Sequence, residues 1–248
     1  MAISPNQGAT GGGDTVTITG TNLANATAVH FGEELATITG NTPTSVTVTS
    51  PSGSGAVDTT VTTSAGTSAP LSFFYLKSPV VTSVEPASGA VAGGDTITIM
   101  GSGLSGATSV DFGGTPVAPT VVSDSEITVV TPATAAGDVV LTVSTPGGLF
   151  DNLVFGFVDP PTAASFTPLL GPAAGDQMVD IVGTDLATAS GVSTVTSVTF
   201  GVTPATFFYA LNSTRLAVLT PAQATGAVTI SLTTTGGSTT VPGAYVYV

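Results

Sequence analysis

The side chains that most enzymes use for proton transfer or nucleophilic attack are scarce in this chain. It has one histidine, His30, and no cysteine. A Ser-His-Asp arrangement would need His30 beside an activated serine and an orienting acid, and no Gly-x-Ser-x-Gly sequence marks such a serine. His30 stands between Val29 and Phe31, which we expect to face inward, so its own side chain should face solvent. An enzyme is therefore the least favoured class of protein.

Paired carboxylates are the other catalytic arrangement to consider, because glycosidases use two of them. The close pairs in this chain are Glu33 with Glu34, and Asp124 with Glu126. The first pair follows a glycine that ends a predicted strand, and the second flanks a turn before a strand that begins near Ile127. We interpret both pairs as solvated turn residues.

The sequence also offers little for binding a metal ion or a cofactor. Asp159, beside Pro160-Pro161, is the best candidate for a calcium ligand between domains, but no Asp-x-Asp-x-Asp-Gly run is present. The run Gly11-Gly12-Gly13 precedes a strand and lacks a following Lys-Ser/Thr, so it indicates a turn and not a phosphate-binding loop. Two glycosylation sequons begin at Asn25 and Asn212, and a threonine-rich chain contains such sequences by chance. We expect no cofactor and no metal.

The charge balance excludes two classes of partner. Only 7% of the 248 residues are charged, and the two basic residues, Lys77 and Arg215, stand against fifteen acids, for a net charge of −13. Nucleic acids and anionic membrane surfaces attract proteins through clusters of cations, which this chain lacks. No stretch approaches the roughly eighteen apolar residues of a membrane span. The N-terminus shows neither the basic nor the apolar region of a signal peptide. Either the protein leaves the cell by a route that this chain does not encode, or lysis releases it, or it stays inside.

Three motifs recur along the chain at a nearly constant spacing and identify three internal repeats. The first motif is an alternating strand that ends at Gly20, Gly101 and Gly183, which are 81 and 82 residues apart. The second is a Val-x-Phe-Gly sequence, and the third is a strand that closes on a proline. Each repeat then ends on alternating aromatic residues: Phe73 and Tyr75, Phe155 and Phe157, and Tyr245 and Tyr247.

Every motif alternates apolar and small polar residues with period two, the pattern of a strand with one buried face. No segment shows a sustained helical stripe, and turn residues recur about every 8–12 residues, as in an all-β sandwich. The sequence therefore predicts an all-β protein made of immunoglobulin-like sandwiches. The residues predicted to face inward are Val16, Ile18, Val29, Phe31, Val46, Val48, Val61, Ile97, Ile99, Val110, Phe112, Ile127, Val129, Leu141, Val143, Val179, Ile181, Val198, Phe200, Leu216, Val218, Ile230 and Leu232.

The repeats resemble IPT/TIG domains, which are immunoglobulin-like folds of the E-set type. The resemblance covers nearly the whole chain, although Gly175-Asp176 replaces the double glycine in the third repeat. It implies the fold and leaves the function open, because such domains occur in receptors, transcription factors, surface adhesins and enzyme accessory modules. The residues that carry it are Ser4-Pro5, Gly12-Gly13-Asp14, Gly20, Phe31-Gly32 and Ser50-Pro51, then Glu85-Pro86, Gly93-Gly94-Asp95, Gly101, Phe112-Gly113 and Thr131-Pro132, then Thr167-Pro168 and Phe200-Gly201.

We predict three domains, over residues 1–77, 78–160 and 161–248. The linkers at residues 77–79 and 158–161 are short and contain proline, so we expect an extended, semi-rigid rod. The later motifs of the third repeat are displaced by 88 or 89 residues, which places an insertion near residues 187–196. Since the insertion falls between strand signals, it should lengthen a loop without disturbing the core.

The ends of the chain hold the candidates for self-association. The second repeat opens on a full strand, whereas the first has three residues before Ser4-Pro5, so its first strand should be short by about four residues. A partly unpaired sheet edge recruits strands from other chains, unless it merely frays. The opposite end is a β-prone segment without a polar tail. The candidate residues are Met1, Ala2, Ile3, Tyr245, Val246, Tyr247 and Val248.

Charge is distributed unevenly among the repeats. The first carries a net charge of −3, the second −8 and the third −2. A head-to-tail contact between the first and third domains would therefore meet little electrostatic opposition.

These observations favour a non-catalytic structural subunit of an extracellular or surface assembly, such as a fibre, sheath or virion appendage. Its partner would be itself, through its end domains, or another surface protein. The alternative is an adhesion or carbohydrate-binding module with glycans as partners, which would normally expose tryptophan or tyrosine. The chain has no tryptophan, and of its four tyrosines only Tyr209 lies outside the closing strands. We interpret Tyr209 and its neighbours Phe207 and Phe208 as a core strand of the third repeat.

Overall fold

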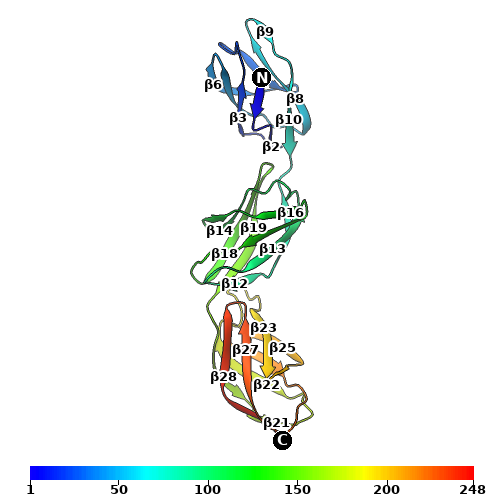
Figure 1. The fold of residues 1–248 in the computed structure, drawn as a ribbon, viewed down its shortest axis with the longest axis vertical. Coiled ribbons are helices and arrows are strands. Elements are labelled where there is room, and N and C mark those ends of the chain that lie inside the picture. Colours follow the sequence, from blue (N-terminus) through cyan, green and yellow to red (C-terminus); the bar gives the residue numbers. More distant parts are fainter.

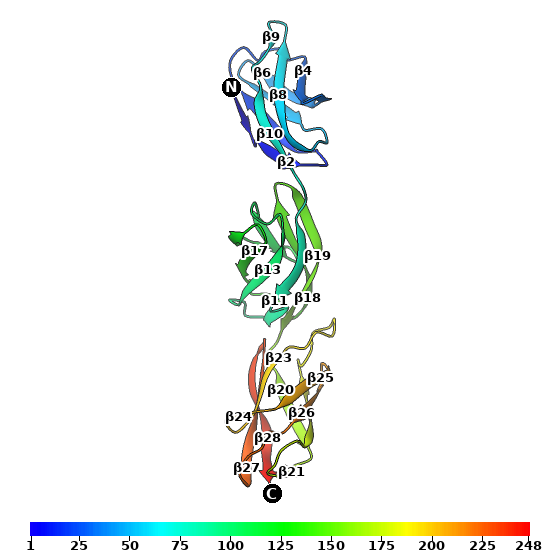
Figure 2. The ribbon, with the colours of Figure 1, turned by 90° about the vertical axis from the view of Figure 1, so that its right-hand side faces the viewer.

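The computed structural model describes all 248 residues and shows three β-sandwiches arranged end to end as a rod (Figures 1 and 2). Every regular element is a β-strand. This confirms the predicted all-β fold of three tandem immunoglobulin-like sandwiches in an extended rod. The structure contains no helix that is long and apolar enough to cross a membrane.

The first domain folds into two sheets that face each other. One sheet has the strand order β1-β3-β7-β6, and the other has the order β2-β10-β8-β4-β5 with β9 paired to β8. The pair of β2 with β10 is parallel, as in the other two domains. The strands are β1 (Ala2–Ser4), β2 (Gln7–Ala9), β3 (Thr15–Thr19), β4 (Ala28–Phe31), β5 (Glu34–Leu35), β6 (Thr37–Thr42), β7 (Ser45–Thr49), β8 (Gly55–Thr63), β9 (Gly66–Thr67) and β10 (Leu71–Leu76).

The second domain repeats this topology with the sheets β11-β13-β17-β16 and β12-β19-β18-β14-β15. Its first and last strands are longer than those of the first domain. The strands are β11 (Val80–Glu85), β12 (Ser88–Ala90), β13 (Thr96–Ser102), β14 (Ser109–Phe112), β15 (Thr115–Val117), β16 (Thr120–Ser123), β17 (Glu126–Val130), β18 (Gly137–Thr145) and β19 (Gly148–Val158).

The third domain has the sheets β20-β22-β26-β25 and β21-β28-β27-β23-β24. Between β22 and β23 runs the longer loop that the displaced motifs of the third repeat indicate. The strands are β20 (Thr162–Thr167), β21 (Leu170–Gly171), β22 (Met178–Thr184), β23 (Val195–Phe200), β24 (Thr203–Pro204), β25 (Phe207–Asn212), β26 (Arg215–Leu219), β27 (Gly226–Thr234) and β28 (Gly237–Tyr247).

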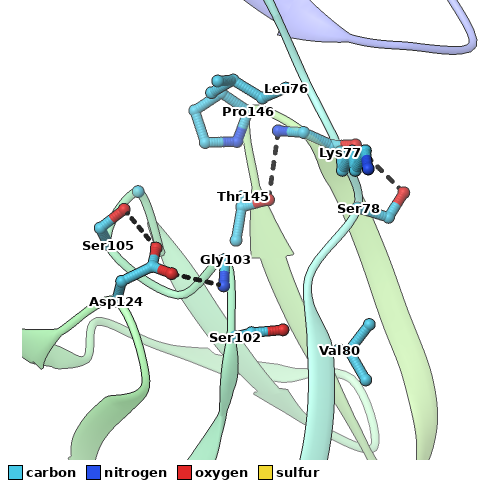
Figure 3. Close-up of a pocket in the computed structure, with 12 residues that line it drawn as sticks. Leu76, Lys77, Ser78, Val80, Ser102, Gly103, Ser105, Asp124, Thr145 and Pro146 are labelled. Carbon is cyan, nitrogen blue, oxygen red and sulfur yellow. Dashed lines mark hydrogen bonds between the residues drawn. The ribbon is translucent and has the colours of Figure 1, made fainter.

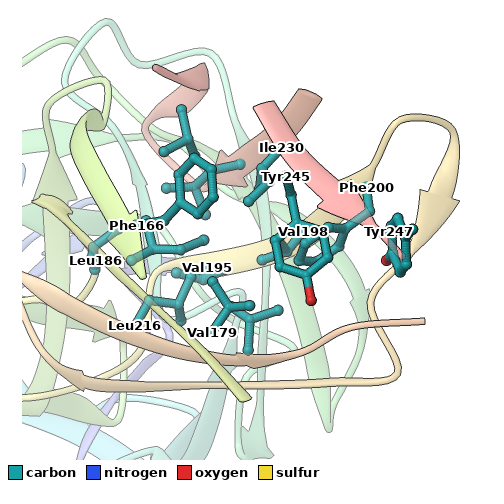
Figure 4. Packing of buried hydrophobic residues seen from close by; sticks show 14 residues of the cluster. Phe166, Val179, Leu186, Val195, Val198, Phe200, Leu216, Ile230, Tyr245 and Tyr247 are labelled. Atoms are coloured by element: carbon teal, nitrogen blue, oxygen red, sulfur yellow. The ribbon is translucent and has the colours of Figure 1, made fainter. Parts of the chain in front are cut away.

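Each domain is held together by its own apolar core between the two sheets. All of the residues predicted to face inward are buried, and none exposes more than 3% of its surface. The closing aromatic residues complete the cores by edge-to-face contact with the Val-x-Phe-Gly phenylalanines, as in the pair of Phe31 with Phe73, whose ring centroids lie 4.9 Å apart. Figure 4 shows the core of the third domain, where Phe200 lies 5.4 Å from Tyr245 between the ring centroids.

The third repeat carries Gln177 where the other two repeats carry an aspartate after the glycine turn, and this difference has a physical reason. In the first domain an Asp14 carboxylate oxygen accepts a hydrogen bond from the Ala9 backbone N–H at 2.8 Å, and the second domain repeats this bond at the same distance. Pro172 stands at the position of Ala9 in the third domain, and proline has no N–H to donate. An aspartate there would lack its donor, and Gln177 takes its place.

The tyrosines that close the first and third domains differ in how their hydroxyls are satisfied. The Tyr75 hydroxyl donates to the Pro51 carbonyl oxygen at 2.8 Å. The buried hydroxyls of Tyr245 and Tyr247 do not meet the geometry of a hydrogen bond, although the Thr220 side chain lies near both. Burial, and secondly the neighbouring Tyr245, raises the pKa of Tyr247 to about 12. The folded state therefore disfavours the phenolate form of Tyr247. The contribution of the protonated Tyr247 to stability is fully present below pH 10 and is lost as the pH rises through about 12.

Replacing Tyr75 and Tyr247 by phenylalanine should therefore have different consequences. We expect Tyr75→Phe to lower the free energy of unfolding by about 1 kcal/mol, because the Pro51 carbonyl loses its donor. Tyr247→Phe removes a hydroxyl without a partner, and Phe157 already fills this position in the second domain, so we expect no loss at neutral pH and improved stability above pH 10. Calorimetric unfolding of both variants at pH 7 and above pH 10 measures both effects. An equal loss in the two variants would contradict this account.

Candidate functional site

The lone histidine lies on the outer face of a strand, and the first carboxylate pair lies in the turn and the short strand that follow it. His30 is half-buried on the outer face of β4, opposite Leu35 and Thr60 on the neighbouring strands. Glu33 lies in the turn after β4 and Glu34 begins β5, and both are exposed to solvent. These positions agree with the predicted outer face and turn.

Of the second carboxylate pair, Asp124 is an exposed turn residue as predicted, whereas Glu126 is half-buried and begins β17. Asp124 also has a structural role. Its carboxylate accepts hydrogen bonds from the Gly103 backbone N–H at 3.2 Å and from the Ser105 hydroxyl at 2.9 Å. These two bonds lower the pKa of the Asp124 carboxyl. The stabilisation that the charged carboxylate gives to the two loops is therefore present at neutral pH and is lost as the pH falls through that lowered pKa. Asp124 thus ties two loops together at the pole of the second domain. Nothing in the linear sequence places Gly103 beside it.

These loops form one wall of a cleft of about 300 Å³ at the junction of the first and second domains (Figure 3). The linker residues Lys77 and Ser78 form the other wall, and the Ser78 hydroxyl donates to the Gly147 carbonyl oxygen at 3.1 Å. Only two of the twelve lining residues are hydrophobic. The cleft is therefore a gap beside the linker that is lined mostly by small residues.

Glycine marks the place where each linker passes over the next domain. A Cβ atom on Gly147 would overlap the Lys77 carbonyl oxygen, and a Cβ on Gly236 would overlap the Asp159 carbonyl oxygen. The corresponding residue of the first domain, over which no linker passes in this chain, is Ala65. Glycine in the second and third repeats, against alanine in the first, is a sequence signal that could have located the junctions.

The remaining candidates lie in turns, in a linker and at the end of β25. No group of three or more His, Cys, Asp or Glu side chains lies close enough to hold a metal ion, so Asp159 does not join a calcium site of that kind. Gly12 and Gly13 have φ values of 70° and 92° in a turn before β3, as expected for a glycine turn. The sequon residues Asn25 and Asn212 are both exposed.

At the N-terminal end, Met1, Ala2 and Ile3 lie at the edge of the first domain. The strand β1 has three residues, whereas β11 and β20 have six each, so it is shorter by three residues rather than about four. In the second domain Val80 and Val81 pair with Ser102 and Gly101, and β1 does not reach the corresponding residues of the first domain. Met1 is 49% exposed and lines a hollow of about 200 Å³ with Leu23 and Val61.

At the C-terminal end, residues 245–248 are not a free sheet edge. Val246 pairs with Ala227 of β27 on one side and with Leu170 of β21 on the other. The rings of Tyr245 and Tyr247 lie in the core, while Val248 is 63% exposed at the outer pole of the rod. Of the candidate residues at this end, the side chains of Val246 and Val248 are the accessible ones.

The aromatic cluster of the third repeat is placed differently from what the sequence predicts. Phe208 packs against the core, but Phe207 and Tyr209 are 53% and 60% exposed, so the interpretation as a core strand is wrong for these two rings. They lie on β25, an edge strand, whose alternate residues face solvent. Across the sheet, Leu219 stands between Phe207 and Met178, and an ion pair joins Arg215 to Asp180 on the adjoining strands.

The other two domains carry smaller or more polar residues at these positions. Thr37 and Thr39 of the first domain, and Ala118 and Thr120 of the second, correspond to Phe207 and Tyr209. The exposed aromatic pair is therefore a property of the third domain and not of the shared fold.

Comparison with known proteins matches this chain to one family of domains along nearly its whole length. The model of the IPT/TIG domain matches residues 1–75, 79–157 and 161–247. Fibrocystin-L of Mus musculus is 37% identical over 114 residues, which are 45% of this chain and 3% of that protein. This chain therefore spans a small fraction of the length of that relative.

Solved structures with similar folds include an extracellular region and a protein in complex with an oligosaccharide. The extracellular region of plexin A4 is 22% identical with a TM-score of 0.48, over 91% of this chain and 21% of that chain. A protein from a mixed-linkage glucan utilization locus of Bacteroides ovatus, solved with a heptasaccharide, is 15% identical with a TM-score of 0.33, over 95% of this chain and 61% of that chain. These likenesses concern the fold alone.

The glycine at the first junction supplies a direct test of how the linker is seated. We expect Gly147→Ala to push the linker away, because the added Cβ would overlap the Lys77 carbonyl oxygen, and so to reorient the first domain on the second. Small-angle X-ray scattering should show an altered maximum dimension, while the cores keep their stability. The matched control is Ala65→Gly, which alters the same position where no linker passes. Superimposable scattering from Gly147→Ala and the unmodified protein would refute this role.

Proposed function

Because the chain belongs to the IPT/TIG domain family in all three of its repeats, we propose that it is a non-catalytic structural subunit of an extracellular or surface assembly. Its copies associate end to end through the first and third domains. One observation carries the proposal: the residues at the two outer poles of the rod occupy the same positions in their domains as the residues that meet at the two internal junctions.

The outer pole of the third domain presents the residue type that is covered at the internal junctions. Val248 occupies the position of Leu76 in the first domain and of Val158 in the second. Val158 is 5% exposed where the second domain meets the third, and Leu76 is half-buried in the first junction, whereas Val248 is 63% exposed. An apolar side chain in this position is suited to burial against another domain.

The outer pole of the first domain presents the complementary surface. Its hollow, lined by Met1, Leu23 and Val61 among others, lies where the cleft beside the linker lies in the second domain. The correspondence extends to individual residues, since Thr21 and Thr63 occupy the positions of Ser102 and Thr145. A second copy that placed Val248 in this hollow would repeat the internal stacking of domains.

Charge and symmetry are consistent with this contact. The end domains carry net charges of −3 and −2, and the domain with −8 lies between them, away from the contact. Two different surfaces meet in such an interface, so it is heterologous and extends into a filament when the rotation between copies does not close a ring. With one lysine and one arginine, the chain also offers few sites to trypsin-like proteases, which suits an exposed appendage.

Light scattering across protein concentration, with negative-stain microscopy, tests the proposal. We expect oligomers or filaments that grow with concentration. We expect Val248→Asp to weaken association by at least about tenfold, or about 1.4 kcal/mol per contact, because a carboxylate would have to be desolvated in the hollow. Deletion of residues 244–248 is a poorer test, because it would remove two core tyrosines.

The control is Val202→Asp, the same change at a valine that is 97% exposed in the turn after β23. It should leave association unchanged. A monomer of 24.0 kDa at every concentration would refute self-association, and attention would then turn to another surface protein as the partner.

A second candidate function, adhesion through carbohydrate binding, is favoured by the exposed aromatic pair on β25. Phe207 and Tyr209 lie two residues apart on one face of an edge strand, so both rings can stack on the apolar faces of sugar rings. The adjoining ion pair of Arg215 with Asp180 offers hydrogen-bonding groups and no net charge. Such a surface suits an extended, neutral polysaccharide.

Binding to a panel of neutral polysaccharides by affinity electrophoresis tests this second function. The double variant Phe207→Ala/Tyr209→Ala should lose at least about tenfold in affinity, since each stacking contact is worth on the order of 1 kcal/mol. Leu35→Ala removes an equally exposed apolar side chain from the first domain and serves as the control. Absence of binding by the unmodified protein, or equal binding by both variants, would refute it.

A further inference from the structure

The junction of the second and third domains is built differently from the first junction. The loop over residues 185–194, between β22 and β23, extends toward the second domain (Figure 2). There the Ser190 backbone N–H donates to an Asp138 carboxylate oxygen at 2.7 Å. A second bond, between the hydroxyls of Ser88 and Thr235, also measures 2.7 Å and joins the same two domains.

The loop is held in shape by its own hydrogen bonds and by the core. Thr188 accepts a hydrogen bond from the Val192 backbone N–H at 3.1 Å through its hydroxyl, and its own N–H donates to the Val192 carbonyl oxygen at 2.8 Å. The Thr188 and Ser190 hydroxyls are 2.9 Å apart. Leu186, at the base of the loop, is fully buried in the core of the third domain. The loop therefore meets the second domain as an ordered projection.

The second domain has changed at the residues that the loop contacts. Asp138 corresponds to Ala56 in the first domain and to Ala227 in the third, so the acceptor is present in the repeat that faces the loop and in neither of the others. Gly156 corresponds to Phe74 and Val246.

A Cβ atom on Gly156 would overlap the Thr188 methyl group, which explains the small residue at this position. An insertion in one repeat is thus matched by two substitutions in its neighbour.

The first junction has no equivalent contact. No hydrogen bond joins residues 1–76 to residues 79–248. The second repeat has no insertion between β13 and β14, so no loop reaches from it to the first domain. The first domain is connected to the second mainly through residues 77–79.

We propose that the loop over residues 185–194 is an interdomain clasp that locks the third domain onto the second. The rod then has a single hinge, at residues 77–79, and the second and third domains move as one body. This arrangement does not depend on self-association, because every contact lies within one chain.

Distance distributions between pairs of spin labels test the clasp directly, and the absence of native cysteine allows labels to be attached at chosen sites. One pair, Val140→Cys with Val202→Cys, spans the second junction. The other, Leu35→Cys with Val122→Cys, spans the first, and all four residues are exposed. We expect a narrow distribution across the second junction and a broad one across the first.

Variants of the clasp should then broaden the distribution across the second junction. We expect Asp138→Ala combined with Gly156→Ala to widen it to the width seen across the first junction, because the acceptor is lost and the added methyl group displaces Thr188. Asp138→Asn keeps an acceptor oxygen and should stay narrow. The variants are compatible with folding, since Ala56 and Ala227 fill the position of Asp138 in the other domains and larger side chains fill that of Gly156.

Thermal unfolding of each variant verifies that its domains are intact. Equal widths across the two junctions of the unmodified protein would overturn the proposal. A distribution that remains narrow in the double variant would overturn it as well.

Discussion

Burial of one face of every strand is the constraint on which this structure depends. The chain has no cysteine and therefore no disulfide, so each domain of about 80 residues is stabilised by apolar side chains enclosed between two sheets. The inward positions are filled by aliphatic residues, and a T-shaped aromatic cluster closes each core. Because these positions are committed to the core, the repeats differ mainly at the poles and on the outer faces.

The repeats differ at positions where one domain meets a linker or a neighbouring domain, and these differences adapt the same fold to each place along the rod. Gly147 and Gly236 lie where a linker crosses, whereas Ala65 lies where none does. Gly156 makes room for a neighbouring loop, and the same position holds Phe74 in the first domain. These differences lie at the junctions and not in the sandwich cores, so a repeat can be stiffened or left hinged without altering its core.

An assembly built from such rods would have alternating mechanical properties. The second and third domains form a stiff unit through the clasp, while the first junction bends at its linker. The outer pole of the first domain lacks a counterpart of the loop over residues 185–194, so an end-to-end contact there would resemble the hinged junction. A filament of this kind would bend at regular intervals while its subunits stay intact.

The sequence by itself determined the fold class, the three repeats and the inward residues, because period-two alternation reports directly which side of a strand is buried. It did not determine the exposure of Phe207 and Tyr209, since an apolar run on an edge strand has the same composition as one in a core. The partners of Asp124, Asp138 and Gly156 were decided only by the tertiary structure. Those contacts join residues far apart in the chain, and their geometry exists only once the domains have folded and been placed end to end.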